Sequence, residues 1–367
     1  MPRTQATPVL LKGRASADGT RTLRRQFAKL RVDGFYRTIA NGAYVSSLGL
    51  GTYLGECDDE EDARYVVATL AALERGVNLL DTAINYRCQR SERALGKAIH
   101  QAIDGGKIKR EQIVVCSKGG YIPLDQNPPA TKEDYRAFLA EEYFLRGIMD
   151  PADIVAGGHC LTGGFIADQI ERSRRNLGLE TIDVYYLHNP EQALDTLPRQ
   201  KFLTIVRDAF AVLEHAVDSG SIGCYGCATW NGLRLPPDAK NHLSLEELVS
   251  LAHDAGGTNH HFCVIQLPIN LAMTEAVRSP TQCLGKDRLS TLEAAHRLGI
   301  SVIASATLMQ AQLTSGLPEQ VKSSFPGFDT DARRAIAFTQ SLPVSAALVG
   351  MKSASHVEEN LASPHTS

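Results

Sequence analysis

The feature that most constrains the fold of this 367-residue chain is a repeated alternation of apolar, strand-length runs with amphipathic helical segments. The expected strands are 46–51, 76–81, 112–118, 182–188, 222–228, 262–266, 300–305 and 344–349. The expected helices are 60–74, 91–102, 163–177, 203–217, 244–255, 287–298, 329–341 and 354–361. Strand followed by helix in this number is the signature of a (β/α)8 barrel, and no glycine-rich phosphate loop follows the first strand as a doubly wound sheet would need. The sequence therefore predicts an α/β protein with one TIM barrel.

The segment before the first strand divides into two parts. Residues 1–33 carry eight Lys/Arg against two Asp, a local charge of +6, and we expect residues 1–34 to form a basic, flexible extension. A targeting peptide is the alternative interpretation of this arm. The barrel domain is then 35–367, and Asn41-Gly42 between two short runs predicts an N-terminal hairpin that closes the barrel floor.

One connection is much longer than the others. About 40 residues separate the third strand from its helix, and loops beyond about 15 residues in a compact domain are usually functional or disordered. Thr131 begins a short predicted helix over 133–146. Because the insertion 121–162 emerges at the C-terminal end of the barrel, we interpret it as a lid, with a purely decorative insertion as the alternative.

Composition narrows the class of protein. The chain is 43% hydrophobic with a net charge of −3, which predicts a soluble protein with no membrane segment, and the basic arm does not continue into a nucleic-acid-binding surface. The eight cysteines are scattered, so we expect them to be reduced in a cytoplasmic protein. Cys224 and Cys227 lie three apart on an expected strand and point to opposite faces, so we predict no metal site there. The adjacent pairs His159-Cys160 and His260-His261 are expected to be structural.

Three of the expected strands end on polar residues that together suggest chemistry. The runs NLLD, IVVCSK and VYYLH end at Asp81, Lys118 and His188, and the C-terminal strand ends of a barrel meet at one mouth. A structural role is the alternative for any one of them. Asp81 would stabilise a buried, charged Lys118, and the ammonium would lower the pKa of Tyr86 toward a useful range. Tyr86 would then be a general acid, and His188 would orient the group that receives the proton.

The motifs that contain these residues resemble a known family. YRT…VSSLGLGTY, GVNLLDTAINY, CSKGG and YYLHNPE, in this order and spacing, are similar to the aldo-keto reductase superfamily from about residue 36 to 361. The resemblance implies hydride transfer from a nicotinamide, usually NADPH, to an aldehyde or ketone. It implies Tyr86 as the proton donor, Lys118 and Asp81 as the residues that tune it, and His188 as the residue that orients the carbonyl.

The resemblance also implies a cofactor site, with departures from the family pattern. Gln266 matches the residue that holds the nicotinamide amide, but Ala228-Thr229 stands where the family has a Ser-Asn pair, and the usual stacking aromatic is absent near Ser305. Lys352 would meet the 2′-phosphate of NADPH. The implied cofactor contacts are Gly51, Thr52, Tyr53, Thr229, Gln266, Ser305, Leu308, Gly350, Lys352, Ser353, Glu359 and Asn360.

Four residues are candidates for the substrate mouth. Arg87 and Arg90 could attract a carboxylated or phosphorylated substrate, or one of them could pair with Glu92 or Glu191 and shape the loop. Tyr121 and Trp230 would make part of the mouth aromatic. The substrate and the oligomeric state are not legible from the sequence.

Three functions remain open from the sequence. The first is an NADPH-dependent reductase of a small-molecule carbonyl, the second a nicotinamide-sensing regulatory subunit, and the third a redox-neutral dehydratase or epimerase on the same scaffold.

Overall fold

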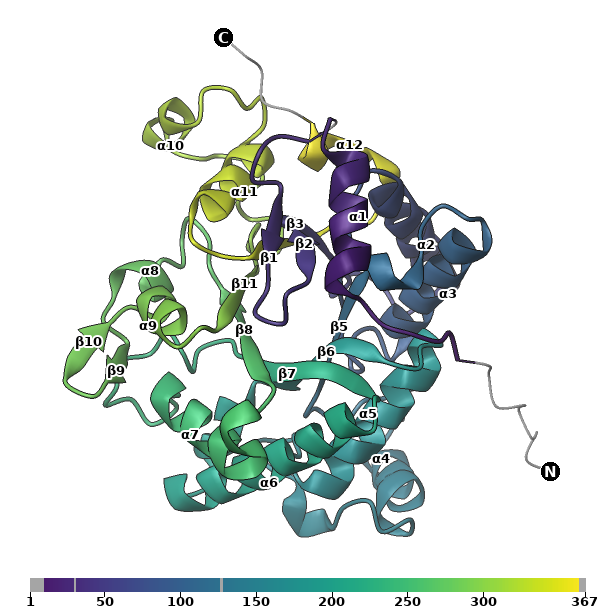
Figure 1. Ribbon diagram of the computed structural model, residues 1–367. Helices are drawn as coiled ribbons and strands as arrows, with labels where there is room; N and C mark the ends of the chain where they lie inside the picture. Colours follow the sequence, from purple (N-terminus) through teal and green to yellow (C-terminus); the bar gives the residue numbers. More distant parts are fainter. Residues whose placement is uncertain (1–9, 30, 126–127, 363–367) are drawn as a thin grey trace.

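Eight parallel strands close into a barrel in the computed structural model, which describes residues 10–29, 31–125 and 128–362 (Figure 1). The last strand pairs with the first, so the sheet has no free edge. In order around the barrel the strands are β3 (Leu48–Gly51), β4 (Leu79–Asp81), β5 (Val114–Gly119), β6 (Ile182–His188), β7 (Ile222–Ala228), β8 (Phe262–Pro268), β11 (Ser301–Ser305) and β12 (Ala346–Gly350). The predicted (β/α)8 barrel is confirmed.

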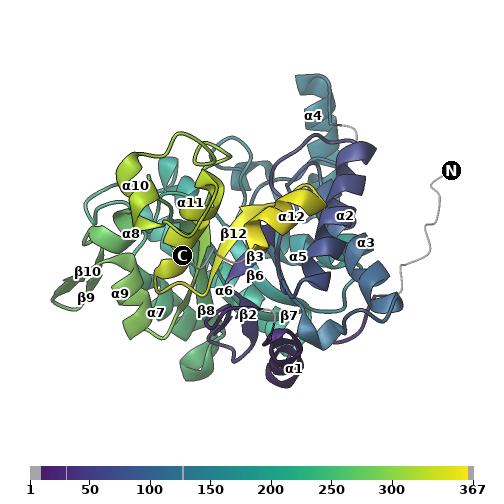
Figure 2. The same ribbon diagram turned by 90° about the horizontal axis from the view of Figure 1, so that it is seen from above.

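Helices surround the barrel, as Figures 1 and 2 show. They are α2 (Asp59–Glu74), α3 (Arg90–Asp104), α5 (Gly163–Leu177), α6 (Arg199–Asp218), α7 (Leu245–Gly256), α9 (Thr291–Arg297), α11 (Asp331–Ser341) and α12 (Ala354–Leu361). Short helices α8 (Glu275–Arg278) and α10 (Glu319–Ser324) lie in connections. Among the described residues no helix is both long and apolar enough to cross a membrane.

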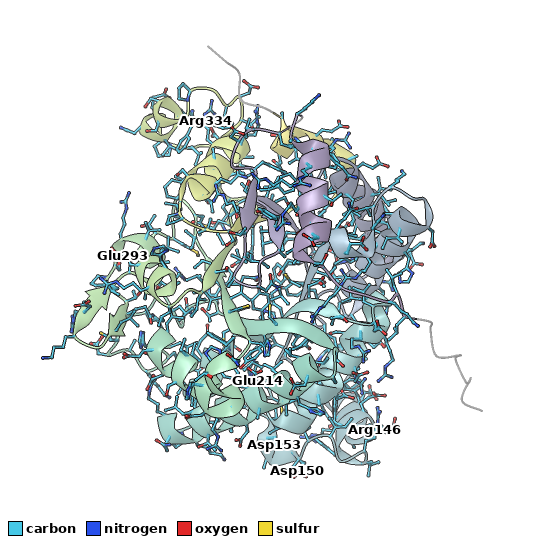
Figure 3. All side chains as sticks on the ribbon, viewed as in Figure 1. Arg146, Asp150, Asp153, Glu214, Glu293 and Arg334 are labelled. Atoms are coloured by element: carbon cyan, nitrogen blue, oxygen red, sulfur yellow. The ribbon has the colours of Figure 1, made fainter. Side chains whose placement is uncertain are left out.

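One predicted helix, 287–298, is wrong at its start. Asp287–Leu289 is strand β10, which pairs with β9 (Gln282–Leu284) in a hairpin, and α9 begins only at Thr291. Ser290 caps the helix by accepting a hydrogen bond from the backbone N–H of Glu293, whose carboxylate accepts from Ser290 in return. Glu293 is labelled in Figure 3. This capping box sets the boundary that hydrophobic periodicity alone did not show.

The strand sequences are continuous apolar runs because both faces of each strand are buried. In β6, Val184 and Tyr186 point into the barrel, whereas Tyr185 and Leu187 pack against the helices. Inward and outward positions alternate in the other strands too, so Cys224 belongs to the interior cluster and Cys227 to the outer one. The predicted opposite orientation of these two cysteines is confirmed.

The N-terminal end of the barrel is closed by the predicted hairpin. β1 (Tyr36–Thr38) pairs antiparallel with β2 (Tyr44–Ser46), and Ile39, Ala43 and Val45 join the apolar cluster inside the barrel. The floor is therefore packed, and the opposite end of the barrel is left for a site.

The expectation of a flexible extension is corrected for the described part of residues 1–34. Helix α1 (Ala17–Phe27) lies beside the floor hairpin, as Figure 1 shows, and its Leu23 is buried in the core. The backbone N–H of Ala15 donates to Asp183 at 2.6 Å, and the N–H of Leu11 donates to the Gly178 carbonyl at 2.8 Å. These long-range contacts fix this segment to the barrel, although its basic composition had predicted a flexible extension. Residues 1–9 lie outside the described part of the chain.

The long insertion packs against the outside of the barrel. It contains α4 (Lys132–Leu139), which continues as a π-helical turn (Ala140–Phe144), close to the predicted helix 133–146. Tyr143 is buried, with its ring centroid 5.6 Å from that of Phe165 on α5. In Figure 2 α4 projects at the end of the molecule opposite α1. A lid movement of residues 121–162 stays a prediction.

Candidate active site

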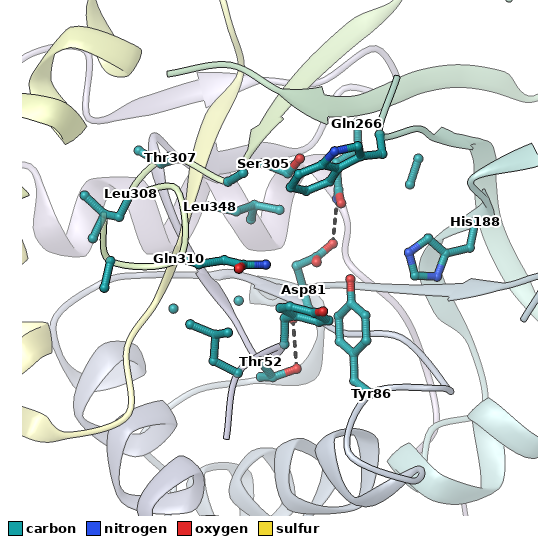
Figure 4. Close-up of a pocket in the computed structure, with 18 of the residues that line it drawn as sticks. Thr52, Asp81, Tyr86, His188, Gln266, Ser305, Thr307, Leu308, Gln310 and Leu348 are labelled. Atoms are coloured by element: carbon teal, nitrogen blue, oxygen red, sulfur yellow. Dashed lines mark hydrogen bonds between the residues drawn. The ribbon is translucent and has the colours of Figure 1, made fainter. Parts of the chain in front are cut away.

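A cavity of about 810 Å³ opens at the C-terminal ends of the barrel strands (Figure 4). It runs from Asn189 and Trp230, past Asp81 and Tyr86, to Asn360 on α12. Its volume lies in the range of small-molecule and cofactor sites. Of the described insertion residues, only Tyr121 lines the cavity, and the loop after β11 covers more of it, through Ala306, Thr307, Leu308, Gln310, Ala311 and Thr314.

Strand alternation explains why four polar side chains meet at this end. Asp81, Lys118, His188 and Gln266 each stand two residues after an inward-facing apolar residue: Leu79, Cys116, Tyr186 and Val264. Each is thus directed into the barrel, and each is buried. The sequence located the first three from strand ends alone.

Asp81 and Lys118 form a buried ion pair. Lys118 Nζ donates to Asp81 Oδ1 at 2.5 Å and to the Thr82 carbonyl at 2.8 Å. Gln266 Nε2 donates to the other carboxylate oxygen at 2.7 Å, as the dashed line in Figure 4 shows. Burial lowers the pKa of Lys118, but Asp81 and Tyr86 raise it, and the net direction is above its ordinary value. The predicted partnership of Asp81 with a charged Lys118 is confirmed.

Tyr86 lies at the centre of the group. Lys118 Nζ is 5.0 Å from the centroid of the Tyr86 ring, and the rings of Tyr53 and His188 stand edge-on to it at 5.0 and 5.7 Å between centroids. The predicted lowering of its pKa is wrong in direction: burial raises the pKa of Tyr86 above its ordinary value and outweighs the opposing effect of Lys118. The phenol is therefore held in its protonated form.

His188 is neutral in this environment. Burial, with smaller effects from Lys118 and His159, holds its pKa well below the ordinary value. Its Nδ1 has no hydrogen-bond partner among the described residues. His159 Nε2 donates to the His188 carbonyl at 2.7 Å, and Tyr121 contacts the His188 ring edge-on at 4.9 Å between centroids. The structural role expected for His159 is borne out by this contact.

Most of the residues expected to contact a cofactor line the cavity. Ten of the twelve do so: Gly51, Thr52, Tyr53, Thr229, Gln266, Ser305, Leu308, Gly350, Glu359 and Asn360. The buried hydroxyls of Thr229 and Thr307 have no hydrogen-bond partner among the described residues. Such a hydroxyl is costly to leave unpaired, which makes both of them candidates to bind a ligand.

The other two, Lys352 and Ser353, do not line the cavity. Lys352 Nζ lies 3.0 Å from Glu61 Oε1, and the Glu61 side chain is only 6% exposed. Ser353 caps α12 by accepting a hydrogen bond from the backbone N–H of His356 at 3.2 Å. A phosphate at Lys352 would therefore compete with Glu61, which the sequence did not suggest.

The two arginines predicted at the substrate mouth lie elsewhere. Arg87 pairs with Asp62 at 2.7 Å, and Arg90 pairs with Asp62 at 2.8 Å and with Asp59. The expected pairing with Glu92 or Glu191 is wrong. Both arginines attach the loop that follows Tyr86 to the first turn of α2, and neither lines the cavity.

The two glutamates have other partners. Glu191 accepts from the backbone N–H groups of Trp230, Asn231 and Gly232 at 2.9, 3.0 and 3.2 Å, and so fixes the loop that carries Trp230. Glu92 accepts from Ser117 at 2.6 Å and thereby joins α3 to β5.

Sequence reasoning missed several residues of the cavity. Asn85 lies inside the quoted motif before Tyr86, and Asn189 follows His188 with a φ of +48° and donates to the Tyr121 hydroxyl at 2.8 Å. Thr307 and Gln310 belong to the loop after β11, and Gln310 points toward the centre of the cavity in Figure 4. A loop this irregular, with positive φ at Ala306, Met309, Gln310 and Ala311, gives no periodic signal.

Comparison with known proteins yields one family. A family model described as the aldo/keto reductase family matches residues 47–242, more than half of the chain. An aldo-keto reductase family 1 member C23-like protein of Equus caballus is 24% identical over 209 residues, 56% of this chain and 47% of that protein. An NADH-specific methylglyoxal reductase of Escherichia coli is 26% identical over 189 residues, 50% of this chain and 48% of that protein. The chain thus spans about half the length of the curated relatives it matches.

Solved structures match over more of the chain. An aldo/keto reductase from Klebsiella pneumoniae, in complex with NADP and acetate, has a TM-score of 0.59 at 20% identity and covers 89% of this chain and 88% of its own. At this level of identity, the similarity establishes the fold.

Proposed function

Because the chain belongs to the aldo/keto reductase family, we propose that it reduces the carbonyl group of a small molecule to an alcohol, with NADPH as the reductant. The observation that carries this proposal is the buried Lys118–Asp81 pair beside a protonated Tyr86 and a neutral His188, with Asp81, Tyr86 and His188 lining one cavity. A bound reduced nicotinamide supplies the hydride that reaches the carbonyl carbon.

The residues of the chain move the proton. His188, being neutral, donates a hydrogen bond to the carbonyl oxygen and orients it toward the Tyr86 hydroxyl. Tyr86 transfers its proton to that oxygen as charge develops there, and Lys118 stabilises the phenolate that remains. The raised pKa of Tyr86 keeps the phenol protonated at neutral pH, as a proton donor must be.

The cavity fits a nicotinamide cofactor on two grounds. It is long enough to connect the ends of β7, β8 and β11 with α12, and the unpaired hydroxyls of Thr229 and Thr307 line it. Thr229 then takes part of the role of the missing Ser-Asn pair. The remaining contacts proposed are Gly51, Thr52, Tyr53, Gln266, Ser305, Leu308, Gly350, Glu359 and Asn360, with Lys352 and Ser353 at the 2′-phosphate.

The substrate end favours a neutral, partly aromatic carbonyl compound. Tyr53, Tyr121 and Trp230 line it together with Asn85 and Asn189, whereas Arg87 and Arg90 are engaged with α2. No lysine or arginine lines this end within the described part of the chain. A carboxylated or phosphorylated substrate would therefore lack a charged partner. A cytoplasmic location remains part of the proposal.

The test is a matched pair of aldehydes. Purified protein with NADPH should reduce benzaldehyde at least about tenfold more efficiently in kcat/KM than 4-carboxybenzaldehyde, since an unpaired charge at an aromatic mouth costs about 1.4 kcal/mol or more. Chromatography of the products checks that one alcohol forms for each NADPH consumed. Product formation without NADPH consumption, or equal turnover by Tyr86→Phe, would contradict the proposed reaction.

A further inference from the structure

Two cysteines stand in contact in the loops that follow Tyr53 and Tyr86. Cys57 Sγ lies 3.6 Å from Cys88 Sγ, Cys57 is exposed and Cys88 is partly exposed. We propose that Cys57 and Cys88 form a reversible disulfide that joins the two loops carrying Tyr53 and Tyr86 and thereby regulates the active site.

The positions of the two cysteines in the chain connect their contact to the active site. Cys88 is two residues after Tyr86, and Cys57 is four residues after Tyr53, in the loop between β3 and α2. The rings of Tyr53 and Tyr86 already contact each other, with 5.0 Å between centroids. A bond between the two sulfurs would therefore constrain both of the loops that hold this ring pair.

The loops are already held together by one buried side chain. Arg87 Nε donates to the Glu56 carbonyl at 2.7 Å, its Nη2 donates to the Asp58 carbonyl at 3.3 Å, and the guanidinium pairs with Asp62 at 2.7 Å. Arg87 is adjacent to Cys88, and its two carbonyl partners flank Cys57. Because folding has brought the thiols together, closing the disulfide costs little additional chain entropy.

The backbone at Cys88 is strained, and hydrogen bonds fix the residues on both sides of it. Arg87, Cys88 and Gln89 have φ values of 49°, 54° and 66°, a run that non-glycine residues rarely adopt. Gln89 is anchored on the other side, where Asn176 Nδ2 donates to its Oε1 at 3.1 Å. A disulfide requires a sulfur separation of about 2.05 Å, so the 3.6 Å contact must shorten, and this loop must move with it.

The chemistry balances with a small disulfide, such as oxidised glutathione, as the oxidant. The Cys57 thiolate attacks one glutathione sulfur, so that the glutathione disulfide breaks, a mixed disulfide forms and one glutathione thiolate leaves. The Cys88 thiolate then attacks Cys57 Sγ and releases the second glutathione thiolate. The two protein thiols are oxidised, the two glutathione sulfurs are reduced, and the two thiol protons pass to glutathione.

The exposure of the cysteines supports this order of attack. Cys57 is the more exposed thiol and meets the oxidant first. Burial, together with the neighbouring Cys57, raises the pKa of Cys88 to about 11, so Cys88 is a poor nucleophile toward an external oxidant at neutral pH and attacks only the sulfur with which it is already in contact. Arg90 opposes this rise in the pKa.

Peptide mapping tests the bond without reference to activity. The full-length protein is equilibrated with glutathione mixtures of increasing oxidised fraction, alkylated and cut with trypsin, which releases Cys57 in residues 38–64 and Cys88 in residues 88–90. We expect the two peptides linked, lighter than their sum by two hydrogen atoms. The link should be retained in the control Cys283→Ser, be absent in Cys57→Ser, and give way to a glutathione adduct on Cys57 in Cys88→Ser. Free thiols or adducts without the linked peptide in wild type would overturn the proposal.

Turnover tests the regulatory part, which rests on the proposed function. Since small displacements of reacting groups cost up to about 100-fold in rate, we expect the oxidised protein to lose about tenfold or more in kcat, restored by dithiothreitol. Cys57→Ser should keep its activity in the same glutathione mixtures. Unchanged kcat in a fully linked sample would overturn the regulatory part. If wild type turned over no carbonyl even when reduced, the proposed function would fail, while the bond would still be judged from the peptides.

Discussion

Two groups of buried side chains in the cavity, the Asp81–Lys118 pair and the hydroxyls of Thr229 and Thr307, differ in how far the protein alone satisfies them. On the side of β4 and β5, Asp81 and Lys118 are fully engaged with each other, with Gln266 and with the Thr82 carbonyl. On the side of β7 and β11, the buried hydroxyls of Thr229 and Thr307 have no partner among the described residues. The ion pair is formed before any ligand arrives, whereas the two hydroxyls can still form hydrogen bonds with a ligand.

The difference suggests a division of roles. A preformed ion pair costs no reorganisation during proton transfer, which suits the chemical step. Unpaired hydroxyls destabilise the free protein and gain energy only when a ligand meets them, which suits binding. Ala228-Thr229 and Ser305, where the resemblance implies other residues, lie on the side of these hydroxyls.

The largest expected effect is on the preformed side. Tyr86→Phe removes the proposed proton donor, and we expect kcat for carbonyl reduction to fall about 10³-fold, within the usual contribution of general acid catalysis. The affinity for NADPH should change less than about threefold, as judged by quenching of protein fluorescence. A variant that kept kcat would assign the proton transfer to another group and remove the division of roles.

His159, which donates to the His188 carbonyl beside the cavity, should make the stability of the protein sensitive to acid. Burial lowers the pKa of His159 to about 4 from its ordinary value of 6.5. The depressed value means that this group contributes stability above pH 6.5, which is lost as pH falls from 6.5 to 4, by about 3 kcal/mol in total. Urea unfolding at a series of pH values should show this slope, and His159→Gln should flatten it. An equal slope in both proteins would contradict a buried, neutral His159.

A smaller effect is expected from the unpaired hydroxyls on the binding side. Thr229→Val and Thr307→Val should each weaken NADPH binding about fivefold to tenfold, since each removes one hydrogen bond to the ligand, and neither should lower the thermal stability of the free protein. Thr69→Val is the matched control, because the Thr69 hydroxyl is also buried without a partner but lies in α2 away from the cavity. Loss of stability with unchanged affinity would make these threonines structural.

The smallest effect concerns the choice of nucleotide. Glu61→Gln would release Lys352 from its carboxylate partner, so NADPH affinity should rise about threefold while NADH affinity stays constant. Competition between the two nucleotides measures this ratio. A rise in both affinities, or in neither, would place the 2′-phosphate away from Lys352.

The barrel and the polar strand ends were predictable from two alternations in the sequence. Strand segments alternate with helix segments along the chain, and inward-facing residues alternate with outward-facing residues within each strand. Once 112–118 is identified as a buried strand with Cys116 facing inward, Lys118 must face the same way. The sign of the Tyr86 pKa shift was not predictable, because it depends on how much burial opposes a neighbouring charge. The folded structure of residues 10–29 was missed for a related reason: its contacts, such as that of Ala15 with Asp183, join residues far apart in sequence.

The other incorrect predictions concerned residues in loops. Arg87 and Arg90 were expected at the mouth because they follow Tyr86, yet their partners Asp62 and Asp59 lie on a preceding helix. The covering segment was sought in 121–162, whereas the loop after β11 contributes more of the lining. Side-chain direction in such segments follows from tertiary contacts and not from periodicity.

The central claim is that this cavity binds NADPH next to Tyr86 and the Asp81–Lys118 pair. Calorimetric titration of wild type and Lys352→Ala with NADPH and NADH tests it most directly. We predict saturable binding of one NADPH per chain, weakened by Lys352→Ala, with NADH binding little changed. Failure of folded wild-type protein to bind either nucleotide would contradict the claim, because Tyr86 would then have no hydride donor to work with.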